Sequence, residues 1–202
     1  MDRPQRIIVG ISGSSGAIYG IRLLEVLAGI ETVETHLVMT PAAGQTIALE
    51  TDYKPRQVEQ MADVSHRIND IAASISSGSY PVDGMIVVPC SMKTAAAIAW
   101  GFDDNLLTRA ADVTLKERRR LVVAPRETPL HLGHLRSLAQ LAEIGAVIAP
   151  PMPAFYRRPE TIGDIVDQSV GRLLDLLSIE APSGLVHRWQ GPSGGQGAPD
   201  DD

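Results

Sequence analysis

Short apolar runs alternate with longer amphipathic segments along most of the chain, and this alternation constrains the fold more than any other feature. It is typical of βαβ units, in which helices cover a parallel sheet. Residues 85–88 are apolar at every position, as expected for a strand that is buried on both faces. We therefore predict a three-layer α/β fold, Rossmann-like or flavodoxin-like, with helices on both faces of a parallel sheet.

The same pattern predicts where the elements lie. We expect strands at residues 6–11, 34–39, 84–88, 121–124 and 146–148. We expect helices at residues 17–28, 42–51, 94–99, 106–118, 130–143 and 162–177. The polar residues 52–81 could hold a short helix and a loop. Residues 1–189 are expected to form one domain, followed by a disordered tail at residues 190–202.

Composition and charge exclude several classes of function. A net charge of −6 over 202 residues gives the chain no overall affinity for nucleic acid or acidic membranes. The single cysteine, Cys90, excludes an intramolecular disulfide and an all-cysteine metal site. The first six residues carry no apolar signal core, and no apolar run reaches membrane-spanning length. We therefore expect a cytoplasmic protein.

Residues 7–16 (IIVGISGSSG) combine a β-branched run with glycines and small hydroxyls, directly before a predicted helix. Gly13 and Gly16 permit close approach or unusual φ angles, and Ser14 and Ser15 add hydroxyl donors. Such a junction can present backbone amides to a phosphate ester. The spacing matches neither the dinucleotide fingerprint nor the P-loop, so the ester is not identified. A plain strand-to-helix turn without a ligand stays open.

Several predicted strands end in proline or a small residue, at Thr40, at residues 89–94 and at residues 125–127. The carboxyl ends of parallel strands form one rim where ligands bind. On this rim Arg126 suits a phosphate contact, and Glu127 suits proton transfer. Ser91 and Thr94 could bind an anion or only cap a helix. Cys90 is interpreted as a small buried residue rather than a nucleophile.

Other candidate residues lie on predicted helices and on one loop. Arg109, Asp112 and Lys116 share a helix face, which could bind phosphate or form a solvated ion-pair stripe. His131 and His134 lie one turn apart and favour polar packing at a helix start over a metal pair. The proline-rich residues 150–159 carry Phe155 and Tyr156, which could line a ligand site or anchor the loop. Arg172 lies on an otherwise apolar helix face, and its pattern alone predicts a surface residue.

Taken together, these motifs resemble the flavin prenyltransferases, the UbiX/Pad-like family of homo-oligomeric flavin proteins. The resemblance covers residues 6–189 and rests on residues 10–16, 89–94 (PCSMKT), 109–112 (RAAD), 115–118 (LKER), 125–127 (PRE) and 155–156. Residues 75–79 (ISSGS) and 150–156 look closest to the branch that accompanies phenolic-acid decarboxylases, which includes their B subunits.

The resemblance implies transfer of a dimethylallyl group from dimethylallyl monophosphate to N5 and C6 of reduced FMN. No metal is implied, because cationic side chains supply the countercharge for the phosphate that leaves. The product, prenylated FMN, would serve a partner decarboxylase of the UbiD type. The resemblance also implies a homo-oligomer, with a dodecamer expected.

The resemblance further assigns roles to individual residues. FMN would be bound by Gly13, Ser14, Ser15, Thr40, Ser91, Met92, Lys93, Thr94 and Arg126. The substrate phosphate would be held by Arg109, Lys116, Glu127, Tyr156 and Arg172. Ser15 would help move the proton of flavin N5, Glu50 would lie near the reacting prenyl group, and Trp189 would cover it. Lys116 and Glu127 would also be catalytic. Ser14 and Thr40 stand where the family commonly has Ala and Ser.

Three other functions could use the same fold. A flavin-dependent cysteine decarboxylase of the phosphopantothenoylcysteine type would share the fold, but it needs an Asn at the strand end that reads PCSMKT here. A non-catalytic FMN-binding subunit of a decarboxylase complex would keep the flavin residues and lose the phosphate residues. An electron carrier of the flavodoxin type does not explain so many cations on the rim.

Overall fold

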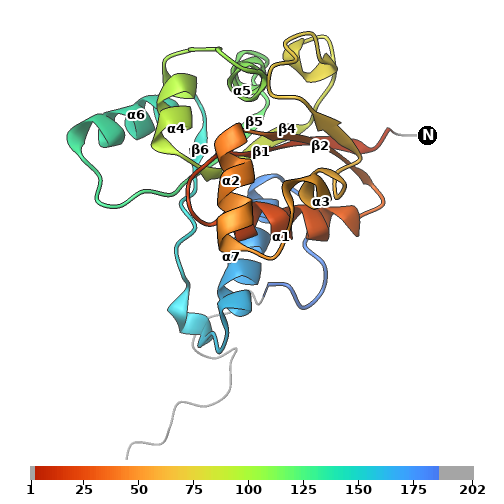
Figure 1. The fold of residues 1–202 in the computed structure, drawn as a ribbon, viewed down its shortest axis with the longest axis vertical. Helices are drawn as coiled ribbons and strands as arrows, with labels where there is room; N and C mark the ends of the chain where they lie inside the picture. The colour runs from red at the N-terminus through yellow and green to blue at the C-terminus, as the bar shows by residue number, and fades with distance from the viewer. Residues whose placement is uncertain (1–2, 187–202) are drawn as a thin grey trace, which may run out of the picture.

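The computed structural model describes residues 3–186, which form one six-stranded parallel sheet flanked by helices (Figure 1). The strands follow the order β3-β2-β1-β4-β5-β6, and each neighbouring pair is parallel. Their bounds are β1 Gln5–Ile11, β2 Val33–Met39, β3 Val64–His66, β4 Gly84–Cys90, β5 Arg120–Pro125 and β6 Val147–Ile148. The predicted three-layer parallel α/β fold is confirmed.

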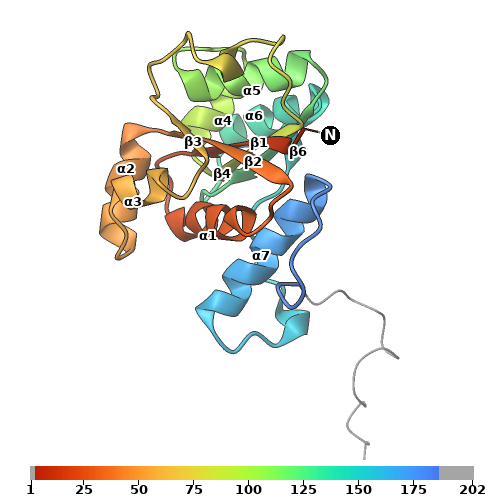
Figure 2. The ribbon, with the colours of Figure 1, turned by 90° about the vertical axis from the view of Figure 1, so that its right-hand side faces the viewer.

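The helices form the two outer layers (Figure 2). One face of the sheet is covered by α1 and α7, with α2 and α3 packed in the same core, and the other by α4, α5 and α6. Their bounds are α1 Ala17–Ala28, α2 Pro41–Glu50, α3 Pro55–Glu59, α4 Met92–Ala99, α5 Leu106–Lys116, α6 Leu132–Glu143 and α7 Ile162–Leu176, with 3-10 turns η1 Ser74–Ser76 and η2 Phe155–Arg157. Within residues 3–186, no helix combines the length and apolar character needed to span a membrane.

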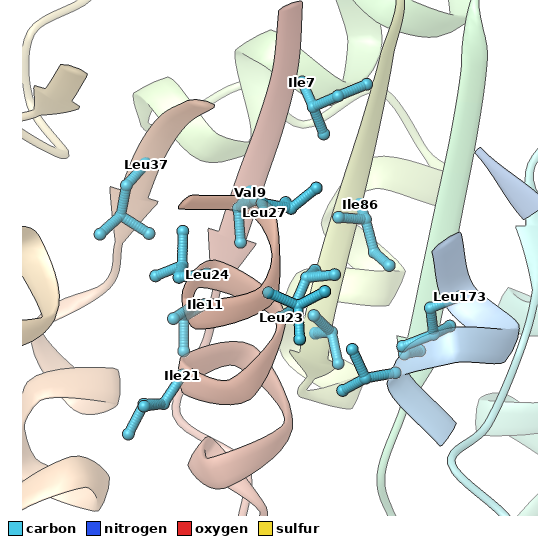
Figure 3. Packing of buried hydrophobic residues seen from close by; sticks show 14 of the residues in the cluster. Ile7, Val9, Ile11, Ile21, Leu23, Leu24, Leu27, Leu37, Ile86 and Leu173 are labelled. Carbon is cyan, nitrogen blue, oxygen red and sulfur yellow. The ribbon is translucent and has the colours of Figure 1, made fainter. Parts of the chain in front are cut away.

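The core lies between these layers and follows the alternation of the strands. Ile7, Val9 and Ile11 of β1 point toward α1 and α7, whereas Ile8 points to the other layer. Figure 3 shows this first cluster, in which leucines of α1 and Leu173 of α7 meet the sheet. Each large aliphatic side chain buried in this way contributes about 1.5–3 kcal/mol. Two apolar cores therefore hold the sheet between its helical layers.

The predicted elements lie close to the observed ones, with instructive differences. Helix α4 begins two residues earlier than predicted, because the Ser91 hydroxyl accepts a hydrogen bond from the Thr94 amide and caps it. Strand β4 continues through Cys90 rather than ending at residue 88. Residues 52–81 hold the expected short helix, α3, and also β3, which was missed. Strand β3 is three residues long and largely exposed, so no apolar run marks it.

Helix α1 packs very closely on the sheet, and this packing fixes the loop that precedes it. A Cβ atom at Gly20 would lie 2.5 Å from the Val88 carbonyl oxygen, so a larger residue would push α1 away from β4. At the start of the helix, Gly16 adopts a φ of +96°, a conformation that favours glycine. The predicted tail at residues 190–202 lies outside the described residues.

Candidate active site

The sheet order reverses between β1 and β4, and the loops that follow these strands meet at the carboxyl edge of the sheet. In open α/β sheets, ligands bind at this switch point. Ser12 ties the two loops together: its hydroxyl donates to the Pro89 carbonyl at 3.0 Å and accepts from the Ser91 amide at 2.7 Å. Sequence reasoning missed Ser12, whose only sign was a hydroxyl at the end of an apolar strand.

The loop between β1 and α1 is tight and contains an unsatisfied hydroxyl. A Cβ atom at Gly13 would collide with the Cβ of Ala42, so only glycine allows this approach to α2. The adjacent Ser14 Oγ is buried and has no hydrogen-bond partner among the described residues. A buried hydroxyl of this kind costs about 1–3 kcal/mol unless another group satisfies it. The loop therefore fits a ligand with hydrogen-bonding oxygens.

Two more predicted flavin residues start helices at the same edge. Thr40 Oγ1 accepts from the Ala43 amide at 3.1 Å at the start of α2, and Ser91 Oγ donates to Thr94 Oγ1 at 3.1 Å. Both residues thus cap helices, and for Ser91 this is the simpler of the two interpretations drawn from the sequence. The remaining amides of these first turns suit an anion. The Met92 side chain is buried in the core beside this edge.

Glu50 connects the end of α2 to the start of α1. Its Oε2 accepts from the amides of Gly16 at 2.8 Å and Ala17 at 3.3 Å. Partial burial acts to raise the pKa of Glu50, but hydrogen bonds from Ser15 and these amides, with the charge of Arg126, lower it overall. The structure thus gathers Ser15, Glu50 and Arg126 in one place. No local pattern marks Glu50, which we could select only through the family resemblance.

Arg126 and Glu127 follow β5 at the same edge, where the sequence placed them. The Arg126 amide donates to the Cys90 carbonyl at 3.0 Å, and both side chains are exposed. Cys90 itself is fully buried, and desolvation raises the pKa of its thiol to about 12. A thiol of this kind is a poor nucleophile. The interpretation of Cys90 as a small buried residue is confirmed.

The residues predicted for the substrate phosphate divide between opposite faces of the sheet. Arg109 and Lys116 belong to α5, whereas Arg172 belongs to α7 in the other layer (Figure 2). Tyr156 lies with Arg172 at a hollow of about 250 Å³ between residues 149–156 and α7. This hollow has apolar walls that include Met152 and Leu173. One chain therefore does not bring the whole predicted set together.

Ion pairs occupy several of these side chains. Arg109 Nη1 lies 3.2 Å from Asp112 Oδ2, Lys116 Nζ lies 2.7 Å from Glu117 Oε1, and Arg172 Nη1 lies 3.1 Å from Asp175 Oδ2. The ion-pair interpretation of the α5 face is thus confirmed for Arg109 and Asp112. At 65% side-chain exposure, Arg172 is also the surface residue that its pattern predicts.

Two predictions remain, one for His131 with His134 and one for Trp189. His131 Nδ1 accepts from the amides of Gly133 at 3.0 Å and His134 at 3.4 Å, so it caps α6. This confirms the prediction of polar packing at a helix start. Trp189 lies outside the described residues, and its predicted role stays a prediction.

Comparisons with known proteins identify the family of this chain. The family model described as Flavoprotein matches residues 1–174. The flavin prenyltransferase UbiX of Salmonella typhimurium is 60% identical over 187 residues, which cover 93% of this chain and 99% of that protein. The crystal structure of AnUbiX (PadA1) with FMN and dimethylallyl pyrophosphate matches with a TM-score of 0.90 and 54% identity, covering 94% of this chain and 99% of that one.

A second solved structure is the dodecameric FMN-dependent UbiX-like decarboxylase from Escherichia coli O157:H7. It matches with a TM-score of 0.90 and 52% identity, covering 93% of this chain and all of that chain. The FMN-dependent cysteine decarboxylase SpaF, at 23% identity and a TM-score of 0.59, shares the fold alone. The chain therefore belongs to the flavoprotein family, as a UbiX-like flavin prenyltransferase.

Proposed function

We propose that this flavin prenyltransferase moves a dimethylallyl group from dimethylallyl monophosphate to N5 and C6 of reduced FMN. Reduced FMN, when bound, supplies the two nucleophilic atoms that receive the prenyl chain. The observation that carries the proposal is the tight loop at the sheet switch point, where Gly13 allows close approach and Ser14 Oγ is buried without a partner. FMN offers this hydroxyl an oxygen or nitrogen to bind.

Ser15 and Glu50 are suited to handle the proton of flavin N5. Glu50 is hydrogen-bonded to Ser15, and its lowered pKa keeps it ionised near neutral pH. The ionised Glu50 carboxylate accepts a hydrogen bond from the Ser15 hydroxyl. The lone pairs of the hydroxyl oxygen then point away from Glu50. We infer that Ser15 Oγ accepts the N5 proton as its own hydroxyl proton passes to the Glu50 carboxylate, so that the serine returns to a neutral hydroxyl.

The cationic residues are suited to the departing phosphate. Breaking the allylic C–O bond leaves negative charge on the phosphate, which preorganised cations stabilise. Arg109, Lys116 and Arg172 would supply this charge, Tyr156 would donate a hydrogen bond, and Glu127 would exchange a proton with the phosphate. We propose that Trp189 covers the prenyl group, because an aromatic face stabilises allylic positive charge.

A shared site follows from the separation of α5 and α7. Because these helices flank opposite faces of the sheet, we infer that Arg109 and Lys116 of one copy complete the pocket at Tyr156 and Arg172 of another. The relative from Escherichia coli O157:H7 is described as dodecameric, which supports a homo-oligomer of this kind. We propose a dodecamer as the working form.

The proposal includes the surroundings of the reaction. We propose that residues 1–189 act as one flavoprotein domain and that the prenylated FMN passes to a UbiD-type decarboxylase. For its location, we propose the cytoplasm.

An anaerobic reaction of the purified protein with reduced FMN tests the proposal. With dimethylallyl monophosphate, mass spectrometry should find a flavin heavier by one prenyl unit. A parallel reaction with dimethylallyl pyrophosphate, the ligand in the AnUbiX structure, decides the donor preference. Flavin binding without a mass gain from either donor would contradict transfer and favour a non-catalytic FMN-binding subunit.

A further inference from the structure

The guanidinium of Arg109 is held by three acceptors from different parts of the chain. Its Nε donates to the Ser76 carbonyl at 3.3 Å, and its Nη1 lies 3.3 Å from Asp103 Oδ2 and 3.2 Å from Asp112 Oδ2. These contacts use Nε and Nη1, and no hydrogen bond from Nη2 is found among the described residues. A guanidinium held this way is preorganised for an anion, because its donors have a fixed direction.

The segment at residues 76–80 also supports the other cations near α5. Arg119 donates to the carbonyls of Gly78 at 2.7 Å and Tyr80 at 3.0 Å. A Cβ atom at Gly78 would collide with Glu117 and lie 2.9 Å from Lys116 Nζ. The lysine and its ion-pair partner therefore rest directly on this glycine. One short segment thus contacts Arg109, Lys116 and Arg119.

The two carboxylates beside Arg109 are placed at an electrostatic cost. Burial and the charge of Asp112 raise the pKa of Asp103, and the hydrogen bond from Arg109 opposes that rise. Asp103 Oδ1 is also buried without a hydrogen-bond partner among the described residues. Asp103 and Asp112 both contact the Arg109 guanidinium, and this cation offsets the repulsion between the two carboxylates. The arrangement is therefore specific to the guanidinium that it holds.

We propose that Asp103, Asp112 and residues 76–80 position Arg109 and Lys116 to receive the phosphate of the prenyl donor. The inference rests on the proposed function, in which these two cations bind that phosphate. Asp103 and Asp112 act through Arg109 and do not themselves touch the substrate. Their benefit is entropic, because an arginine that is already ordered loses less rotamer freedom when it binds.

The same carboxylates could instead weaken phosphate binding. The direction in which a mutation changes KM therefore decides between the two roles. Carboxylates next to Arg109 compete with phosphate for the same positive charge. If they only neutralise a surface arginine, removing one should strengthen phosphate binding. If they position it, removal should weaken binding. The Michaelis constant for dimethylallyl monophosphate therefore separates the two roles.

The test measures FMN affinity, KM and kcat for Asp103→Asn and Asp112→Asn in the intact oligomer. We expect KM for dimethylallyl monophosphate to rise roughly tenfold, the cost of ordering one long side chain. We expect kcat to fall less than about threefold, because bound phosphate orders the guanidinium at saturation. FMN affinity should stay unchanged. Gly78→Ala should raise KM in the same way, through displacement of Lys116.

Matched controls are present in the chain. Asp104 is adjacent to Asp103, and the contact of its Oδ1 is with Asn105 Nδ2 at 2.6 Å, so Asp104→Asn should leave KM unchanged. Gly29 ends α1, where a Cβ atom would meet only the Val26 carbonyl oxygen at 3.4 Å. Gly29→Ala is therefore the control for Gly78→Ala. Size-exclusion chromatography and thermal melting check that each variant assembles.

A double-mutant cycle protects the test against unfolding effects. In an Arg109→Ala background, Asp103→Asn should change KM no further, because it acts only through the arginine. An unchanged or lower KM in the single Asp variants, or an equal effect with and without Arg109, would overturn the proposal. Failure of the proposed function is distinguishable, since the wild-type protein would then form no prenylated flavin.

Discussion

The flavin side and the phosphate side of the candidate site are built in different ways. The flavin side collects the loops after β1, β2, β4 and β5, which share one edge of the sheet because the strands are parallel. The phosphate side draws on α5 in one outer layer and α7 in the other (Figure 2). The sheet itself separates these two helices.

This difference shows what one chain can assemble alone. Strand ends converge whatever their separation in sequence, so Ser15 and Arg126 reach a common place through topology. Helices on opposite faces are each about 10 Å from the sheet, and no side chain spans that thickness. We therefore expect flavin binding to be a property of the single fold and donor binding to need a second copy.

The largest expected effect comes from a substitution that disrupts the flavin side of the site. Gly13→Val places branched carbons where even a Cβ collides with Ala42, so the loop must open away from α2. We expect FMN affinity to fall by at least about 100-fold, as several hydrogen bonds are lost together. Flavin fluorescence titration measures this. Gly29→Ala is the control, and unaltered FMN binding in Gly13→Val would remove the loop from the site.

The next two variants disrupt only the phosphate side of the site. Lys116→Ala should bind FMN normally and lower kcat/KM for the prenyl donor about 100-fold, the loss of one charged contact to a developing anion. Glu127→Gln should likewise keep the flavin and lose turnover. Anaerobic product analysis by mass spectrometry provides the measurement. Full activity in either variant would show that its assignment to the phosphate site is wrong.

A smaller change tests one hydrogen bond on the flavin side of the site. Ser14→Ala should weaken FMN binding about five- to tenfold, because one hydrogen bond to the ligand is lost. The same change removes a buried hydroxyl without a partner, so the free protein should become slightly more stable. Titration and thermal melting without FMN give the two values. A loss of stability without FMN would mean that Ser14 already has a structural partner.

The smallest expected effect concerns Glu50 and pH. Its pKa is lowered in the folded protein, so its stabilising contribution is present above the ordinary value of 4.5 and is lost as pH falls through the lowered value. Because the side chain is mostly exposed, Glu50→Gln should lower the free energy of unfolding by only about 0.5–1 kcal/mol at neutral pH. Denaturant unfolding at several pH values tests this, since the difference from wild type should vanish in acid.

Much of the fold could be predicted because its signals are local. Apolar runs marked β1 and β4, and residues 17–28 were predicted as a helix with the bounds of α1. Strand β3 was missed because its three residues are mostly exposed and its place depends on pairing with β2. Helix α4 was predicted two residues short because its cap is a side-chain contact.

The candidate site was less accessible to sequence reasoning. Strand-end residues such as Arg126 were found because charge at a buried strand's end has no packing role. Ser12 and Glu50 were not found from the pattern, since each acts through a hydrogen bond across the fold. The division between α5 and α7 was also invisible, because spacing along a helix does not tell which layer the helix joins.

Co-expression of two inactive variants tests the shared phosphate site most directly. Lys116→Ala and Arg172→Ala each leave every site of a uniform oligomer without one cation. In mixed oligomers, we expect about a quarter of the sites to combine an intact Lys116 from one copy with an intact Arg172 from another. Prenylated FMN should then form at about a quarter of the wild-type rate. Mixed oligomers that stay as inactive as either uniform oligomer would contradict the shared site.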